Sequence, residues 1–364
     1  MTYLYLVIAI LFIAYIVDNQ KNSRDTVSIR LSDGLIKFLL FIICIILIMF
    51  SACRNGYNDT TTYISWYYSM NNLYSVTNDF SIGSEALFMI AMYCMNTLGF
   101  SHNVFFAVNA AIFVIPAIIF IYRYSKTFFL SMVVFMATCY LFGLAGMRQQ
   151  TATGFLMIAY MCYENKKKLL AVIIFVIAQY THAYSFIFLA LFLVYKLKLW
   201  DKGMAFYLVA CTGLMAVLPS FAGIIQSISD ILGTDYGEGL FTGESVTILR
   251  FLVCFYPIIA SILWKKNLVT TFDESDTRYF NIAMISPFTL MFALVALPYI
   301  FGRLGSFFAV FYCVGVGNML KVILKEEDGA IKFFVHVLAV ALYIIYVLYD
   351  IYTHSSNFAN PFGF

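Results

Sequence analysis

Long apolar segments alternate with short polar stretches along almost the whole chain. Several segments are shorter than the roughly 20 residues of a straight crossing, which favours tilted or broken helices and a locally thinned bilayer. The segments predicted to cross a membrane are residues 3–17, 35–51, 103–121, 128–146, 150–163, 168–180, 184–197, 203–219, 246–264, 281–300, 304–320 and 331–350. The pattern therefore predicts an all-α, polytopic integral membrane protein with about 12 transmembrane helices. Residues 1–364 are predicted to form a single membrane domain.

One further apolar segment, residues 85–98, decides the topology. It is short, and it is bounded by Glu85 and by Asn96-Thr97. If it does not cross, 18 of the 22 basic residues lie in the cytoplasm, including every lysine. The other four basic residues are arginines. The positive-inside rule favours this arrangement, whereas it fails at every later loop if the segment crosses. We therefore predict a short juxtamembrane or re-entrant helix here and both termini outside.

The same topology defines two large outer loops. The first, residues 52–84, is rich in tyrosine, asparagine, threonine and tryptophan. The second, residues 220–245, is acidic and punctuated by glycine. Loops of this kind are mobile and often carry binding residues.

Composition narrows the class of protein. Hydrophobic residues make up 63% of the chain, charged residues 11%, and the mean hydropathy is +0.88. These values exclude a soluble domain of this size. The basic residues follow the loops and form no stripe, so the net charge of +3 indicates no nucleic-acid partner. The eight cysteines include no CxxC pair or Cys/His cluster, and no P-loop or GxGxxG motif is present. No metal, nucleotide or other cofactor is therefore predicted.

The basic residues that this topology leaves outside are all arginines: Arg54, Arg148, Arg250 and Arg303. Arginine offers a rigid donor fork that matches phosphate and carboxylate groups. Arg148, followed by Gln149, lies between two apolar segments, where a central arginine costs about 2.5–3.5 kcal/mol. His182 interrupts another apolar run in the same way. We predict that the two interruptions belong to one site.

Structural roles compete with this interpretation. Arg54 and Asp59 also fit a snorkelling interfacial arginine and a turn residue. Arg250 fits an ion pair with a nearby carboxylate, and Arg303 fits an anchor at a helix end. A histidine at a helix break, such as His182, is often a hydrogen-bonded structural residue.

Arginines and carboxylates that converge at an outer membrane face suit a lipid-linked diphosphate. Nearby aromatic and amide side chains suit a sugar. Glycosyl transfer from such a donor needs positive charge for the leaving diphosphate and a base for the acceptor hydroxyl. Arg54, Arg148 and Arg303 are candidates for holding the phosphates, and Asp59 or His182 is the candidate base.

Four short patterns, taken in order, resemble one known family. They are Arg54-(x4)-Asp59-(x3)-Tyr63, Ser84-Glu85-(x2)-Phe88, Gly146-x-Arg148-Gln149 and His182-(x2)-Ser185. Together they resemble the EpsG-type family, the membrane polymerases of bacterial exopolysaccharides and capsules, which are similar to the Wzy O-antigen polymerases.

The resemblance implies a C-type glycosyltransferase-like fold with its active site on the outer side of the bacterial plasma (inner) membrane. It implies transfer of oligosaccharide repeat units from undecaprenyl diphosphate to a growing lipid-linked glycan. Membrane lipid, a chain-length regulator and a flippase are the further partners it implies. Glu85 stands where the family has an acidic residue, although many relatives have proline at the next position and this chain has Ala86.

The candidate residues are Asp59, Glu85 and His182 for catalysis, and Arg54, Tyr63, Arg148, Gln149 and Arg303 for substrate binding. The sequence does not separate a polymerase from an O-antigen ligase or a single-sugar transferase that uses the same lipid donor. A flippase for lipid-linked oligosaccharides would place ionisable residues near the middle of the membrane, often with internal repeats. A scaffold protein of a polysaccharide assembly complex would tolerate the loss of Arg148 and Asp59. Because the unexplained charges cluster at outer helix ends, we predict an enzyme, a membrane polysaccharide polymerase.

Overall fold

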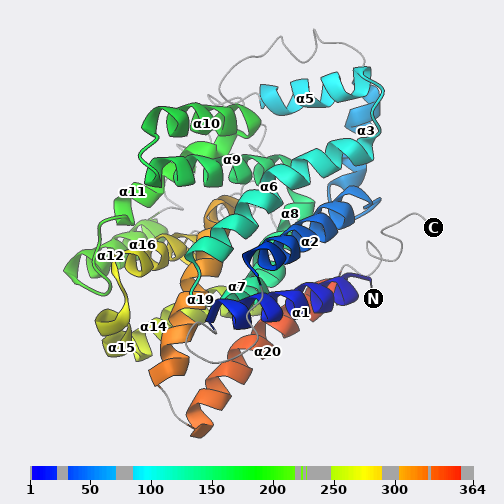
Figure 1. Ribbon diagram of the computed structural model, residues 1–364. Coiled ribbons are helices and arrows are strands. Elements are labelled where there is room, and N and C mark those ends of the chain that lie inside the picture. Colours follow the sequence, from blue (N-terminus) through cyan, green and yellow to red (C-terminus); the bar gives the residue numbers. More distant parts are fainter. Residues whose placement is uncertain are drawn as a thin grey trace. The chain divides into compact units, whose positions relative to one another are not determined.

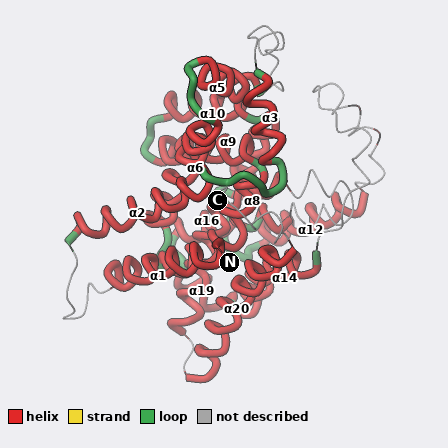
Figure 2. The backbone as a smooth tube through the Cα atoms, turned by 90° about the vertical axis from the view of Figure 1, so that its right-hand side faces the viewer, coloured by secondary structure: helices red, strands yellow, loops and turns green. Residues whose placement is uncertain are grey.

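The computed structural model describes the chain as helices joined by turns and loops (Figure 1, Figure 2). It describes residues 2–22, 32–70, 85–217, 247–288, 303–326 and 329–353, together with Gly223 and Ser227. No β-strand occurs in these residues. The later part of the first predicted outer loop, residues 71–84, lies outside them, and so does the second loop apart from Gly223 and Ser227.

The chain separates into two compact units, one comprising Met1–Ser185 with Val347–Phe364 and the other comprising Phe186–Tyr346. The helices described in the first unit are α1 (Thr2–Asn22), α2 (Asp33–Ala52), α3 (Thr60–Ser69), α5 (Ala86–Thr97), α6 (His102–Tyr124), α7 (Phe128–Val134), η2 (Phe135–Tyr140), α8 (Leu141–Ala145), α9 (Met147–Glu164) and α10 (Lys168–Thr181). Those described in the second are α11 (Leu191–Val194), α12 (Lys202–Val217), α14 (Ile248–Leu263), α15 (Lys265–Thr271), α16 (Glu274–Ala283), η5 (Gly305–Phe308) and α19 (Ala309–Glu326). Two elements, η3 (Ala183–Ala190) and α20 (Gly329–Thr353), continue from one unit into the other.

The described helices that are long and apolar enough to cross a membrane number five: Tyr3–Lys21, Asp33–Ala52, His102–Tyr124, Phe128–Ala145 and Gly305–Lys325. The pair α14 and α15, which is bent by 81°, would make a sixth span. The prediction of a polytopic all-α membrane protein is thus confirmed, but the described residues support fewer long spans than the predicted number of about 12. Length is one reason, because the predicted crossings 168–180 and 184–197 form the apolar helices Lys168–Thr181 and Ala183–Val194, which have only 10–17 residues. In addition, most of the predicted crossing 281–300 lies outside the described residues.

The apolar segment predicted over residues 128–146 is helical with an irregular middle. α7 passes into the π-helical turn η2, and the helix ends with α8 at Ala145. Such turns widen a helix locally and are frequent at functional sites. This one carries Tyr140, whose hydroxyl donates to the carbonyl oxygen of Leu47 at 2.6 Å. The π turn is thereby fixed to α2.

The ends of α1, α6 and α7 are held together by polar contacts. Lys21 donates to the carbonyl oxygens of Tyr122 at 2.5 Å and Ser125 at 2.6 Å, at the C-terminal end of α6. A cation is favourable there because the last helical carbonyls lack backbone partners. Asp18 accepts the backbone N–H of Phe128 at 2.6 Å, where α7 begins.

Buried polar side chains also organise the second unit. Asp273 and Asp276 form a capping box at the start of α16, and Asn318 of α19 donates to Asp276 at 3.0 Å. Asn281 donates to the carbonyl oxygen of Leu197 at 2.7 Å. These contacts tie α16 to α19 and to the segment after α11.

In the first unit, α9 packs against both α6 and α10 (Figure 1). The two backbones of α9 and α6 approach closely at Gly154, where an added Cβ atom would lie 2.1 Å from the carbonyl oxygen of Ile112. Thr151, one turn earlier, donates to the side chain of Asn109 on α6 at 2.7 Å. Small residues permit such contact between helix backbones. Gly154 therefore fits against α6 because it has no side chain.

Replacing Gly154 with valine is expected to prevent folding of the first unit. The new side chain would collide with backbone atoms of α6, which cannot turn away as a flexible side chain can. The amount of monodisperse protein recovered after detergent extraction should fall strongly. The control is Gly213→Val in α12, where an added Cβ atom meets nothing within 4 Å. Normal yield and melting temperature for Gly154→Val would contradict the close α6–α9 contact.

Candidate active site

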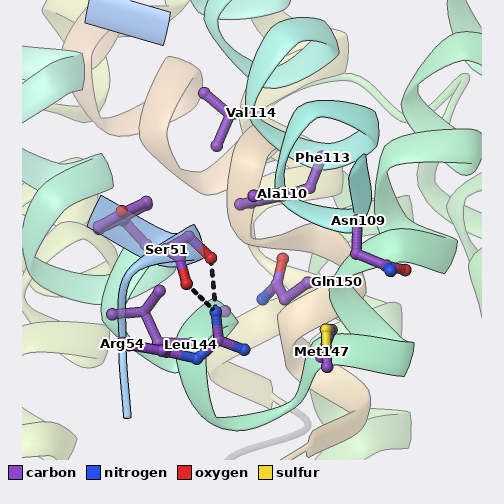
Figure 3. Close-up of a pocket in the computed structure, with 11 residues that line it drawn as sticks. Ser51, Arg54, Asn109, Ala110, Phe113, Val114, Leu144, Met147 and Gln150 are labelled. Atoms are coloured by element: carbon purple, nitrogen blue, oxygen red, sulfur yellow. Dashed lines mark hydrogen bonds between the residues drawn. The ribbon is translucent and has the colours of Figure 1, made fainter. Parts of the chain in front are cut away.

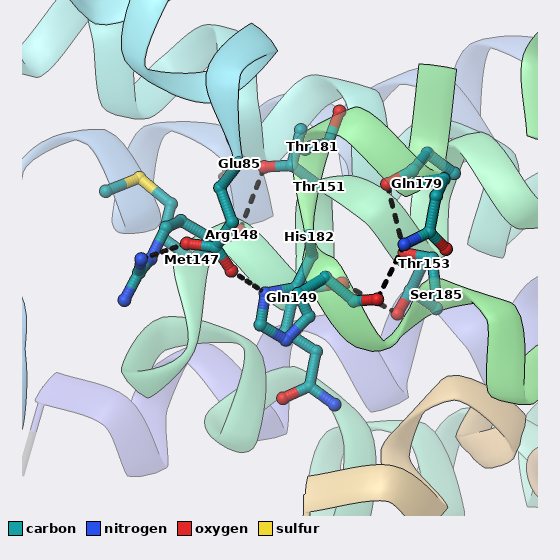
Figure 4. A network of polar contacts seen from close by, with 12 residues as sticks. Glu85, Met147, Arg148, Gln149, Thr151, Thr153, Gln179, Thr181, His182 and Ser185 are labelled. Atoms are coloured by element: carbon teal, nitrogen blue, oxygen red, sulfur yellow. Dashed lines mark hydrogen bonds and ion pairs between the residues drawn. The ribbon is translucent and has the colours of Figure 1, made fainter. Parts of the chain in front are cut away.

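A single carboxylate, that of Glu85, joins the two polar interruptions that stand out in the sequence (Figure 4). Its Oε2 accepts a hydrogen bond from Nη1 of Arg148, and its Oε1 bonds Nδ1 of His182. It also accepts the backbone N–H of Ala183. We term Glu85, Arg148 and His182 the Glu85 cluster.

Every member of the Glu85 cluster lies at a helix end. Glu85 immediately precedes α5, Arg148 lies in the first turn of α9, and His182 follows the last residue of α10. α9 starts anew because Gly146, with φ −101° and ψ 66°, leaves the helical region. His182 is extended, with φ −151° and ψ 129°. The helix breaks therefore turn three side chains toward one point.

Side chains stabilise the break at His182. Ser185 donates from Oγ to the carbonyl oxygen of Ala178 at 3.0 Å. Gln179 donates from Nε2 to the carbonyl oxygen of Ala183 at 2.6 Å (Figure 4). Helix ends leave backbone groups without intrahelical partners, and these contacts satisfy two of them. The position of His182 is thereby fixed from both sides.

The backbone of Glu85 is in the left-handed region, with φ 54° and ψ 30°. A residue with a Cβ atom pays about 1–2 kcal/mol in this conformation. Such strain persists where surrounding contacts determine the conformation, and it is concentrated at functional sites. At Glu85 the contacts are those to Arg148, His182 and Ala183, so the strained residue is the one that joins the other two members of the cluster.

Electrostatics keep Glu85 ionised. Burial raises the pKa of its carboxyl, but the hydrogen bond and charge of His182 and the charge of Arg148 outweigh burial, so the pKa of Glu85 lies below its usual value. The side chains of Glu85 and His182 are 11% and 8% exposed, and that of Arg148 is 27% exposed. Arg148 is therefore the member most open to an approaching anion.

Aromatic rings of α3 form one side of the site. The guanidinium of Arg148 lies 5.1 Å from the ring centre of Trp66 and 5.9 Å from that of Tyr63. Its Nε donates to the Tyr63 hydroxyl at 3.4 Å. The two rings meet edge to face at 5.7 Å, and Phe88 of α5 packs against Tyr63 at 6.0 Å. We term Tyr63 and Trp66 the aromatic wall.

The contacts just described bring together four of the eight predicted site residues: Tyr63, Glu85, Arg148 and His182. The remaining four are Gln149, Asp59, Arg54 and Arg303. Gln149 follows Arg148 and is 3% exposed. Asp59 is half-buried at the start of α3, one turn before Tyr63. Arg54 lines a small cavity of the first unit that does not include the Glu85 cluster, and Arg303 belongs to the second unit. The Glu85 cluster and the aromatic wall therefore belong to the first unit.

Two contributors were missed by sequence reasoning. Trp66 was noted only as part of a loop composition, although it follows Tyr63 by three residues, and a helix places such residues on one face. The backbone N–H of Ala183 carries no sequence signal.

Among the described residues, no three His, Cys, Asp or Glu side chains are grouped so that they could hold a metal ion.

Comparison with models of known protein families identifies the family of the chain. The family model described as EpsG family matches residues 37–362. The chain belongs to the EpsG family. The resemblance seen in the sequence is thereby confirmed, and this EpsG-family protein is a membrane protein of the glycosyltransferase-like polysaccharide polymerase type. No curated protein and no solved structure matches the chain.

Proposed function

We propose that this EpsG-family protein transfers oligosaccharide repeat units from undecaprenyl diphosphate to a growing lipid-linked glycan. The reaction takes place on the outer face of the bacterial plasma membrane. The observation that carries the proposal is the carboxylate of Glu85, which holds an imidazole and an arginine together. A base and a cation for the leaving group are what transfer from a lipid diphosphate needs. Family membership supports the polymerase class.

His182 is the general base of the proposed reaction. Because Nδ1 is bonded to the ionised Glu85, its proton stays there and Nε2 is the basic nitrogen. Nε2 takes the proton of the acceptor hydroxyl while the hydroxyl oxygen attacks the anomeric carbon of the donor. Glu85 orients the ring and stabilises the imidazolium that forms, as the aspartate of a serine protease does for its histidine. Asp59, at the start of α3, is the alternative base.

Arg148 stabilises the negative charge of the leaving diphosphate in this proposal. As the new glycosidic bond forms, the bond between the anomeric carbon and the phosphate oxygen breaks, and its electron pair goes to the diphosphate. A positive charge placed where this negative charge develops stabilises the transition state. Arg148 is the most exposed member of the Glu85 cluster, with 27% of its side chain accessible. Gln149 and Arg303 are proposed as further contacts to the donor.

The aromatic wall binds sugar rings in this proposal. Tyr63 is buried, whereas Trp66 is partly exposed. An indole face offers a large apolar surface at low cost in side-chain entropy, so it suits the apolar face of a sugar. The contact of Arg148 with Trp66 would place the sugar beside the phosphate group to which it is attached.

The length of α5 supports an active site at the outer interface. Its 12 residues span about 18 Å as a helix, which is well short of the hydrocarbon thickness of about 30 Å. A helix of this length fits the predicted juxtamembrane position, which leads into the site through Glu85. The proposal keeps the predicted topology, with both termini outside and a C-type glycosyltransferase-like architecture.

Complementation of a gene deletion tests the proposal. The deletion strain is restored with wild type, His182→Gln or Asp59→Asn, at matched protein levels, and the polysaccharide is separated by length. His182→Gln should reduce polymer about 10²–10⁴-fold, the usual contribution of a general base, and leave single lipid-linked repeat units. Asp59→Asn should retain polymer.

The matched control for His182 is His102→Gln. His102 bonds the hydroxyl of Tyr68 at 3.0 Å and lies at the start of α6. This variant should make polymer of normal length. Normal polymer from His182→Gln, with loss in Asp59→Asn, would transfer the role of base to Asp59.

A further inference from the structure

A small cavity of the first unit lies between α2, α6, α8 and α9 (Figure 3). Its volume is about 20 Å³, which exceeds the roughly 10–15 Å³ that one water molecule requires. It has room for one small occupant, but not for a diphosphate or a sugar ring. Arg54 and Gln150 are among the residues that line it. We term it the Arg54 cavity.

Arg54 brings a buried positive charge to this cavity. The residue is 3% exposed. Its Nη1 donates to the carbonyl oxygen and hydroxyl of Ser51 at 2.7 and 2.6 Å, and its Nε donates to the Thr60 hydroxyl at 3.2 Å. The guanidinium lies 4.5 Å from the ring centre of Phe106. Its Nη2 has no hydrogen-bond partner among the residues that the structure describes.

None of these contacts supplies a counter-charge. Ser51, Thr60 and Phe106 are neutral, and within the part of the chain that the structure describes, no carboxylate pairs with Arg54. Burial lowers the pKa of Arg54 to about 10, so the group is still cationic at neutral pH. An unpaired buried charge is strongly unfavourable unless an opposite charge reaches it.

Gln150 brings the second unpartnered group. It is 3% exposed, and within the described part of the chain neither its Oε1 nor its Nε2 has a hydrogen-bond partner. Its side chain packs against Gly143, where an added Cβ atom would lie 3.1 Å from Cγ of Gln150. The side chains of Arg54 and Gln150 turn toward the same space (Figure 3).

Folded proteins leave few buried polar atoms without a partner, and three of them here belong to two residues of one cavity. This grouping indicates an occupant. A neutral water molecule would satisfy hydrogen bonds but would leave the charge of Arg54 uncompensated. A small anion would accept from both nitrogens and also neutralise the guanidinium.

We propose that the Arg54 cavity binds one monovalent anion of about the size of chloride, held by Nη2 of Arg54 and Nε2 of Gln150. The anion is the counter-ion of Arg54 and is not consumed in any reaction. The site does not depend on the proposed function. It links α2 to the first turn of α9, so its occupation should stabilise the first unit.

The test compares the melting temperature of the purified protein in sodium chloride, bromide and gluconate at equal ionic strength and pH. Chloride and bromide should raise the melting temperature saturably, by about 2–4 °C at high occupancy. Gluconate is too large for the cavity and should have no saturable effect. In the bromide form, anomalous scattering from crystals should place one bromide between Arg54 and Gln150.

Variants separate this site from general salt effects. Gln150→Met keeps the volume of the side chain but removes the donor, so the saturable response should disappear. Arg278→Gln should keep it, because Arg278 lies in the second unit and pairs with Glu274 at 3.2 Å. Equal wild-type melting temperatures in all three salts, or electron density for water alone, would overturn the proposal. A response that persists in Gln150→Met would overturn it as well.

Discussion

Glutamine in place of Glu85 is expected to abolish polymer formation while the protein remains folded. A neutral amide can neither hold the proton of His182 on Nδ1 nor stabilise the imidazolium, and it removes the charge that Arg148 contacts. The expected loss in the rate of glycosyl transfer is about 10²–10⁴-fold, the range for a disabled general base. The measurement is the rate of chain elongation by purified protein in lipid nanodiscs.

A matched control is available in the second unit. Glu274 also pairs with an arginine, Arg278, but its side chain is 92% exposed. Glu274→Gln should therefore elongate chains at the wild-type rate. Wild-type elongation by Glu85→Gln would show that the Glu85 cluster is structural.

The effect of Glu85 on stability should depend on pH. Because the pKa of Glu85 is lowered in the folded protein, its ionised form stabilises the fold above the unfolded pKa of about 4.3. That stabilisation is lost as the pH falls through the folded pKa. The melting temperatures of wild type and Glu85→Gln should therefore converge in acid.

Lysine in place of Arg148 is expected to reduce elongation at least about 10²-fold, the scale on which a single transition-state donor contributes. Lysine keeps the positive charge but has one nitrogen. Arg148 reaches Glu85 through Nη1 and the Tyr63 hydroxyl through Nε, with its plane near the ring of Trp66. A compact ammonium group cannot make these contacts together. The measurement is again the elongation rate in nanodiscs.

Arg278 provides the comparison for Arg148. It donates to Glu274 and lies 4.4 Å from the ring centre of Tyr195, so it also combines an ion pair with an aromatic contact. Arg278→Lys should elongate chains normally. If Arg148→Lys is equally active, charge alone suffices at this position, and the forked geometry of arginine has no role.

The helix breaks were predictable because their residues conflict with an apolar helix. Gly146 ends a helix, and a polar Arg148-Gln149 pair follows it. His182 follows α10 in the same way. Positive charges in loops similarly predicted that residues 85–98 do not cross, and this stays a prediction, with α5 described as a helix of 12 residues.

The partners of these residues were not predictable from one sequence. Glu85 lies 63 residues from Arg148 and 97 from His182, and no local pattern encodes such a pairing. The π turn of η2 also carries no signal, because its residues are as apolar as those of a regular helix. Arg54 and Arg148 also have different partners, Ser51 and Thr60 for the first and Glu85 for the second, and the sequence carries no sign of this difference.

The left-handed backbone of Glu85 limits which residue can follow it. Proline restricts the preceding residue to extended conformations, whereas Glu85 is left-handed with φ 54°. Ala86, which stands where the resemblance to the family leads us to expect proline, permits this conformation. The departure from the family pattern is therefore compatible with the contacts of Glu85.

The most direct test of the account uses purified protein in liposomes with a lipid-linked repeat unit as the only substrate. Mass spectrometry follows the length of the glycan and the release of undecaprenyl diphosphate. We expect stepwise products, with one undecaprenyl diphosphate released for each unit added, and neither product from His182→Gln. Unchanged repeat units that move across the bilayer without any released diphosphate would contradict a polymerase and identify a transporter.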